Sequence, residues 1–134
     1  MITTLLIYSD TGIAILRIVL ALVLMAHGLP KLKNLKQTAE QFSAMGFKRA
    51  RFWGTVVAVV ESLGGLLLLL GFFTQIVAVI IAVQFLVATL KVKLAKGLVG
   101  GYEFDLLILA AAFALITLGG GAWSLDSLLR ILVY

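Results

Sequence analysis

The sequence contains no cysteine and a single histidine, His27. A chain without cysteine has no disulfide, no thiolate nucleophile and no thiol ligand for a metal. Protein zinc sites need several histidine, cysteine or carboxylate ligands, so the sequence predicts no metal site. It also has no haem-ligand pair and no flavin motif. Any redox role therefore has to work through a bound cofactor or a partner protein.

Charged residues are also scarce. They make up 13% of the 134 residues, whereas hydrophobic residues make up 63%. A soluble domain carries about 25% charged residues. A chain of this length cannot bury so much apolar surface inside itself, so lipid must be its solvent. We therefore predict an integral membrane protein that forms one domain over residues 1–134.

Four apolar stretches are long enough to cross a bilayer, whose core of about 30 Å requires roughly 20 residues in a helix. They are residues 12–29, 52–73, 75–92 and 104–121. Pro30 follows the first stretch and Gly71 lies near the end of the second, and both are typical helix stops. The sequence thus predicts an all-α membrane protein, a bundle of four transmembrane helices.

Two shorter helices are expected outside the spans. Residues 34–47 place Leu35, Phe42 and Met45 at helical spacing, which predicts an amphipathic helix in the membrane interface after the first span. Ser124 begins the C-terminal segment and is a suitable N-cap for a short surface helix.

The basic residues indicate an orientation. Nine of the eleven lysine and arginine residues lie in the two connections, residues 30–51 and 93–102, or just before the second one, at Lys91. The positive-inside rule places these loops in the cytoplasm and both termini outside. The net charge of +5 is then explained by contact with anionic lipid headgroups, and we expect no nucleic-acid partner.

Glu61 lies well inside the second span, where an ionisable residue costs at least about 2.5 kcal/mol on insertion scales. Arg17 lies about six residues into the first span and is the first candidate for its partner. His27 is the second candidate. The pair either forms part of a functional site or simply fixes two helices in register.

Further polar residues can join Glu61 in the bundle interior. The predicted ligand-binding or intramembrane polar site consists of Arg17, His27, Lys31, Glu61 and Gln84. Two of these have a structural alternative. Gln84 can form an interhelical hydrogen bond, and His27 can extend to the lipid headgroups instead of lining a site. No catalytic residue is indicated.

Small residues and further charges complete the pattern. We expect Gly28, Gly64 and Gly65 to let helices approach closely. Three polar residues are expected at the cytoplasmic ends of the last two spans: Lys91, Glu103 and Asp105. Lys91 and Lys93 are expected to extend to the headgroups.

An ordered set of segments resembles the DoxX family of small four-helix bacterial membrane proteins. The segments are "LRIVLALVLMAHGLPKL", "VVESLGGLLLLLGFFTQIVA" and "GYEFDLLILAAAFALITLGGGAWSLD". The resemblance covers roughly residues 13–128. The family pattern falls on Arg17, His27, Gly28, Lys31, Glu61, Gly64, Gly65, Glu103 and Asp126.

The resemblance implies a link to redox chemistry, since the family is named after a subunit of a membrane thiosulfate:quinone oxidoreductase. One expectation is therefore a redox-associated protein that binds a quinone or another lipophilic molecule among its helices. A second is a non-enzymatic scaffold or assembly factor for a protein partner. A third is a small transporter of protons or solutes, which would have to form a homo-oligomer to enclose a pathway.

Overall fold

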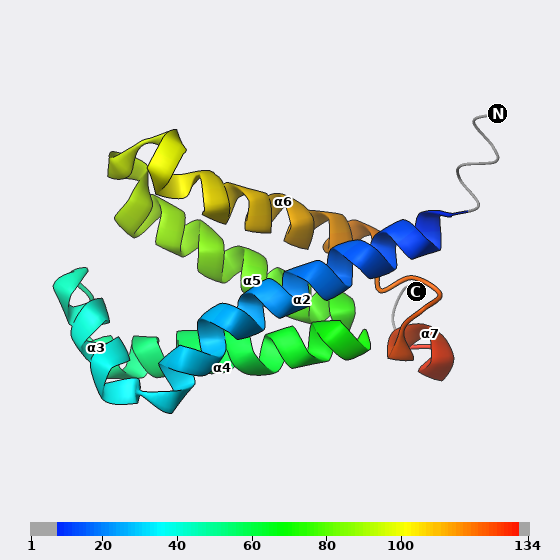
Figure 1. Ribbon diagram of the computed structural model, residues 1–134, viewed down its shortest axis with the longest axis horizontal. Helices are drawn as coiled ribbons and strands as arrows, with labels where there is room; N and C mark the ends of the chain where they lie inside the picture. The colour runs from blue at the N-terminus through cyan, green and yellow to red at the C-terminus, as the bar shows by residue number, and fades with distance from the viewer. Residues whose placement is uncertain (1–7, 132–134) are drawn as a thin grey trace.

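The computed structural model describes residues 8–131, and its regular elements in that range are all helical (Figure 1). Four helical segments are long and apolar enough to cross a membrane, as predicted. They are α2 (Ser9–Lys33), α4 (Ala50–Leu70), α5 (Thr74–Ala88) with its extensions η1 (Thr89–Lys93) and η2 (Leu94–Lys96), and α6 (Glu103–Leu118) with the kinked segment η3 (Leu98–Tyr102) before it.

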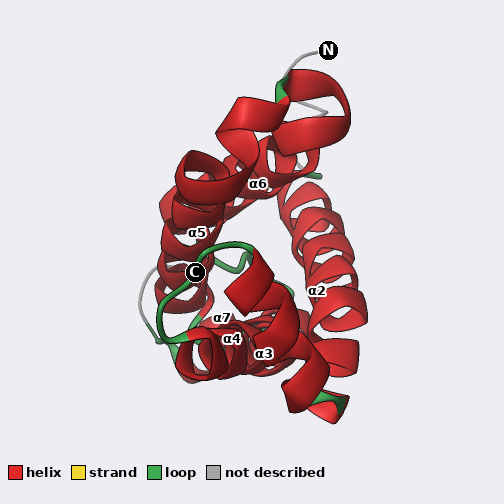
Figure 2. Cartoon of the chain, turned by 90° about the vertical axis from the view of Figure 1, so that its left-hand side faces the viewer, coloured by secondary structure: helices red, strands yellow, loops and turns green. Residues whose placement is uncertain are grey.

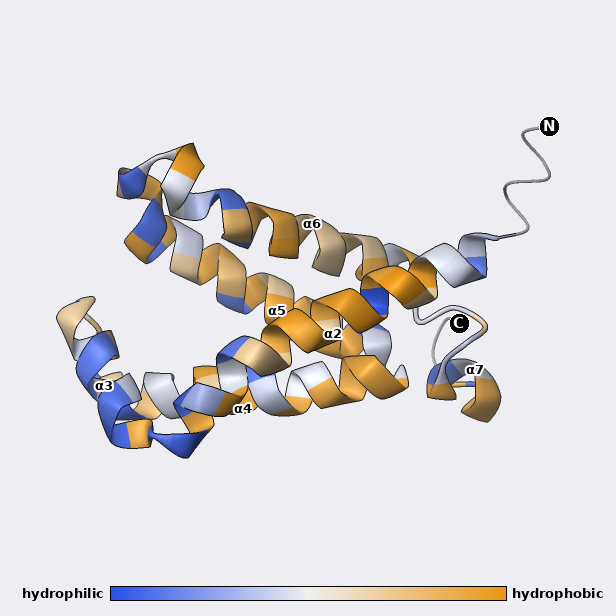
Figure 3. Ribbon diagram, viewed as in Figure 1, coloured by the Kyte–Doolittle hydropathy of each residue, from blue (hydrophilic) through white to orange (hydrophobic). Residues whose placement is uncertain are grey.

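The four long helices surround one core in the order α2, α4, α5, α6 (Figure 2). The buried core residues are Leu20, Ala21, Leu24, Leu68, Val77, Ala78, Ile81, Phe85, Ile108, Ala112 and Leu115. The outward faces are apolar as well: Leu107 is 71% exposed and Phe113 65%. Apolar residues predominate along the four long helices, with a few hydrophilic bands within them, and most hydrophilic residues gather at the helix ends and on α3 (Figure 3). This is the distribution that lipid contact requires.

The two shorter helices lie at opposite ends of the bundle. The amphipathic helix predicted over 34–47 is α3 (Leu35–Ala44), which packs against α4 through buried Thr38 and Phe42. It lies at the end that carries residues 31–51 and 89–102, here called the basic end (Figure 1). The predicted C-terminal helix is α7 (Leu125–Leu129), and the Ser124 side chain caps it. It lies at the opposite end, here called the terminal end.

One predicted helix stop is correct and the other is wrong. Gly71 ends α4 in the left-handed conformation, with a φ of 69°. Pro30, in contrast, lies inside α2, which continues to Lys33. Proline lacks an N–H, so α2 has no hydrogen bond from residue 30 to the preceding turn, but the helix still continues for three more residues.

At the terminal end, Arg17 is 2% exposed and donates three hydrogen bonds to main-chain carbonyls. Nη1 donates to Leu68 at 2.6 Å and to Leu69 at 2.8 Å, and Nη2 donates to Trp123 at 2.6 Å. The last carbonyls of a helix have no partner within it, so the guanidinium caps the C-terminus of α4. The prediction that Arg17 pairs with Glu61 is wrong, because carbonyls at the end of the helix take its donors.

Asp126 caps the next helix in the chain. Its carboxylate accepts hydrogen bonds from the N–H groups of Phe73 at 2.7 Å and Thr74 at 2.8 Å, at the start of α5. Phe73 occupies the N-cap position without a polar side chain, so the acceptor has to come from elsewhere. Arg17 and Asp126, here called the terminal clasp, together satisfy both helix ends of the α4–α5 turn.

The glycines differ in how much room they have. A Cβ on Gly28 would lie 2.6 Å from Ser62 N, and one on Gly65 would lie 2.6 Å from Met25 Cγ. Both glycines lie where α2 meets α4, and their missing side chains allow that close approach. Gly64 is buried against α5, but a Cβ there would lie 3.4 Å from Val77, an ordinary contact.

Gly28→Ala should therefore destabilise the protein by about 1–3 kcal/mol, because the added methyl meets main-chain atoms that cannot rotate away. Gly64→Ala is the matched control, and it should leave the thermal unfolding temperature in detergent unchanged or raise it, since alanine favours a helix. Equal melting temperatures for the two variants would contradict the difference in packing.

Replacing Arg17 by methionine should lower the free energy of unfolding by about 3 kcal/mol, because buried carbonyls lose a charged donor and Asp126 loses a nearby cation. Thermal unfolding in detergent measures the effect. Arg51→Met, at an exposed position of α4, should change little. A melting temperature for Arg17→Met as high as that of Arg51→Met would show that the clasp is not required.

Candidate functional site

Glu61 lies in the middle of α4 and is 3% exposed. Its Oε2 accepts a hydrogen bond from Lys31 Nζ of α2 at 2.8 Å, and its Oε1 accepts one from Gln84 Nε2 of α5 at 3.1 Å. These three residues are here called the Glu61 cluster. The prediction that Glu61 faces the interior within reach of a group on the first helix is confirmed. The partner is Lys31, whereas Arg17 and His27 were the predicted choices.

Close packing at Gly28 brings Lys31 to Glu61. A Cβ on Gly28 would lie 2.6 Å from Glu61 Cβ, so the backbones of α2 and α4 nearly touch at this point. Lys31 follows three residues later and lies on the same helix face. Because α2 continues past Pro30, Lys31 is held in a helical turn rather than in a loop.

The Glu61 cluster retains hydrogen-bonding capacity. An ammonium group has three N–H donors and an amide has two, and one of each is used on Glu61. The Lys31 side chain is 28% exposed, compared with 4% for Glu61. The hydroxyl of Ser62 is buried, and no hydrogen-bond partner for it exists among residues 8–131. The cluster can therefore donate hydrogen bonds to a carbonyl oxygen that reaches it.

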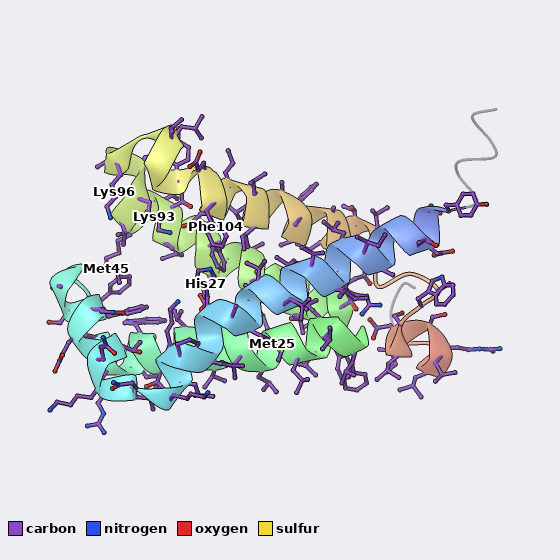
Figure 4. The ribbon with its side chains drawn as sticks, in the orientation of Figure 1. Met25, His27, Met45, Lys93, Lys96 and Phe104 are labelled. Carbon is purple, nitrogen blue, oxygen red and sulfur yellow. The ribbon has the colours of Figure 1, made fainter. Side chains whose placement is uncertain are left out.

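His27 lies beside this cluster and faces a different helix. Its imidazole packs against the Phe104 ring of α6, with centroids 5.2 Å apart and planes tilted by 49°. The two side chains point toward each other between α2 and α6 (Figure 4). His27 is exposed and Phe104 is 37% exposed. His27 and Lys31 are four residues apart, so they lie on neighbouring turns of one face of α2.

A second polar group connects α5 to α6 near the basic end. Asp105 is fully buried, and its Oδ1 accepts a hydrogen bond from Lys93 Nζ at 2.7 Å. Thr89 Oγ1 bonds the carbonyl oxygen of Phe85 at 2.8 Å and lies 3.4 Å from the other oxygen of Asp105. Lys93 thus forms an ion pair, where the sequence analysis expected it to extend to the headgroups.

The remaining predicted polar residues lie at the surface of the basic end. Lys91 is exposed, and its ammonium group lies 4.4 Å from the centroid of the Phe47 ring, a cation–π contact between η1 and the segment after α3. Glu103 is exposed and accepts a hydrogen bond from Gly100 N at 3.1 Å. Neither residue is bonded to the Glu61 cluster.

Sequence reasoning missed two contributors to this region. Phe104 was not singled out, and Lys93 was not assigned to Asp105. The ion pair had a usable signal, since two oppositely charged residues flank a short connection between antiparallel helices. The contact of Phe104 with His27 had none, because it depends on how α6 rotates against α2. Among the described residues, no group of three or more histidine, cysteine, aspartate or glutamate side chains is placed to hold a metal.

Comparison with known proteins gives two relatives and a family. The protein named "Putative oxidoreductase CatD" from Bacillus subtilis is 32% identical over 117 residues, which cover 87% of this chain and 86% of that protein. An uncharacterised membrane protein of Mycobacterium tuberculosis is 29% identical over 125 residues, covering 83% and 77%. No solved structure gives a significant match. The DoxX family model matches residues 12–94, most of the chain, and with the four-helix architecture this shows that the protein is a member of the DoxX family.

Proposed function

We propose that this protein is a redox-associated component of the bacterial inner membrane and binds a quinone-like molecule at the Glu61 cluster. The observation that carries the proposal is a buried carboxylate in the middle of a membrane-spanning helix, held between a partly exposed lysine and an amide. An ionisable group at such a depth is costly and is by default a candidate functional group.

The donors of the cluster match the chemistry of a quinone. Lys31 and Gln84 have spare N–H groups for a carbonyl oxygen. The apolar outer faces of the helices suit an isoprenoid tail that stays in the lipid. Glu61 is the group that would exchange a proton with the bound molecule when it is reduced. Since the chain has no cysteine, we assign the electrons to a redox protein that partners it in the membrane. The name of the Bacillus subtilis relative, which describes it as an oxidoreductase, also supports a redox role.

A second candidate function is a scaffold that holds a partner protein. One observation favours it: both oxygens of Glu61 already have partners within the chain, so the cluster also suffices to fix α2, α4 and α5 in register. Under this alternative, the polar groups contribute stability alone and no lipophilic molecule binds. Measurements of binding and stability on the same variants separate the two functions.

The binding prediction concerns Glu61→Gln. Removing the charge breaks the ion pair that holds Lys31 in place. Binding of ubiquinone-1 to the protein in lipid nanodiscs should weaken by about tenfold, the loss expected when one charge-assisted hydrogen bond, from Lys31 to a quinone carbonyl, is lost. Isothermal titration measures the affinity, and thermal unfolding of the same samples measures stability. Lys31→Met, which removes a donor instead of the carboxylate, should weaken binding in the same way.

Glu103→Gln is the matched control, since that carboxylate is exposed and lies outside the cluster. It should bind ubiquinone-1 as the unchanged protein does. If the unchanged protein binds no quinone, and Glu61→Gln mainly lowers the melting temperature, the scaffold is the correct function. If Glu61→Gln and Glu103→Gln bind equally well, the quinone lies elsewhere.

We further propose that the basic end faces the cytoplasm and that both termini lie outside. The support is the concentration of lysine and arginine at one end of the bundle. A reporter that is active only in the cytoplasm should give no signal when fused after Tyr134, and a strong signal when fused after Lys96. The reverse pattern of activities would overturn this orientation.

A further inference from the structure

We infer that a lipophilic molecule reaches the Glu61 cluster sideways from the bilayer, through the seam between α2 and α6 that His27 and Phe104 close. The inference rests on the proposed function and names its route of access. It assigns to these two residues a role in admitting the ligand, separate from the binding donors Lys31 and Gln84.

The seam between α2 and α6 changes character along its length. Toward the terminal end, the two helices share the buried core, to which α2 contributes Leu20 and Leu24 and α6 contributes Ala112 and Leu115. Past Leu24, toward the basic end, the ring pair of His27 and Phe104 bridges them. Both rings are partly exposed, so this part of the seam is closed by side chains that can rotate.

Burial increases from this seam toward the carboxylate. Phe104 is 37% exposed, the Lys31 side chain 28% and Glu61 3%. His27 is exposed and lies one helical turn from Lys31. A molecule that displaces the ring pair therefore meets the spare donors of Lys31 before it meets Glu61.

The neighbouring seams are less suitable. Between α2 and α4, main-chain atoms meet at Gly28 and Gly65, so opening this seam would require whole helices to separate. Between α4 and α5, the hydrogen bond from Gln84 to Glu61 spans the seam, and a ligand passing there would break the site that it has to bind. At the α2–α6 seam the two helices pack less extensively than the other neighbouring pairs, and side-chain rings bridge them near the cluster.

The test uses the absence of native cysteine. In the double variant His27→Cys/Phe104→Cys, a short methanethiosulfonate cross-linker that reductant releases joins the two helices. The rate of ubiquinone-1 association with the protein in nanodiscs is then measured by stopped flow. We expect cross-linking to slow association at least about tenfold, an effect on the on-rate that reductant reverses. The two single-cysteine variants, treated in the same way, should show no change.

A second pair of variants covers the case in which the double variant does not fold. Phe104→Ala should speed ubiquinone-1 association and Phe104→Trp should slow it, whereas the same changes at Phe113 should have no effect. Phe113 lies on the same helix and is 65% exposed. Equal rates with and without the cross-link, or equal rates for all Phe104 variants, would overturn the route while leaving quinone binding intact. A protein that binds no quinone would overturn both proposals.

Discussion

The contact between α2 and α4 at Gly28 determines the geometry of everything near Glu61. Because Gly28 has no side chain, the backbone of α2 lies directly against Glu61 Cβ and Ser62 N. That approach places Lys31, one turn further along, within 2.8 Å of the carboxylate. With α2 in this position, His27 faces α6 and contacts Phe104. One missing side chain thus fixes both the ion pair within the membrane and the ring pair beside it.

Charged groups inside an apolar bundle have to be satisfied by the protein itself, since lipid offers no hydrogen bonds. The two ends of this bundle meet the requirement differently. At the terminal end, Arg17 and Asp126 form hydrogen bonds with main-chain atoms at the ends of helices. These bonds replace the ones that a further helical turn would have supplied. Near the basic end, Lys31 and Lys93 reach into the bundle and satisfy carboxylates. The first arrangement stabilises a turn. The second holds side chains of three helices together at Glu61 and joins the extension of α5 to α6 at Asp105.

The sequence was sufficient for the spans, because hydropathy over 20 residues depends on little besides composition. It also identified Gly71 as a helix end and Ser124 as a cap, since both act on their own neighbours in the chain. The sequence-based prediction for Arg17 was wrong. Counting residues along a span shows which residues lie at the same depth in the membrane, but it does not show that the end of another helix offers free carbonyls. The hydrogen bond from Gln84 to Glu61 was one of two alternatives that the sequence left open. Only the relative rotation of the helices decides such contacts.

Access to unused donors distinguishes a structural charge from a candidate for binding. Arg17 also has an N–H without a partner among the described residues, at Nε, but this group is buried. Arg17 is almost completely buried, and its guanidinium already donates to three carbonyls, so no ligand can reach it without unfolding the turn. Lys31 is partly exposed and uses one of its three donors on Glu61, so a ligand oxygen can bind there while the ion pair persists. Both cations belong to α2, yet only the ammonium group of Lys31 is both accessible to a ligand and provided with unused N–H donors. Accessibility and unused donors, more than charge within a span, therefore make the Glu61 cluster the part of this molecule best suited to bind a lipophilic carbonyl compound.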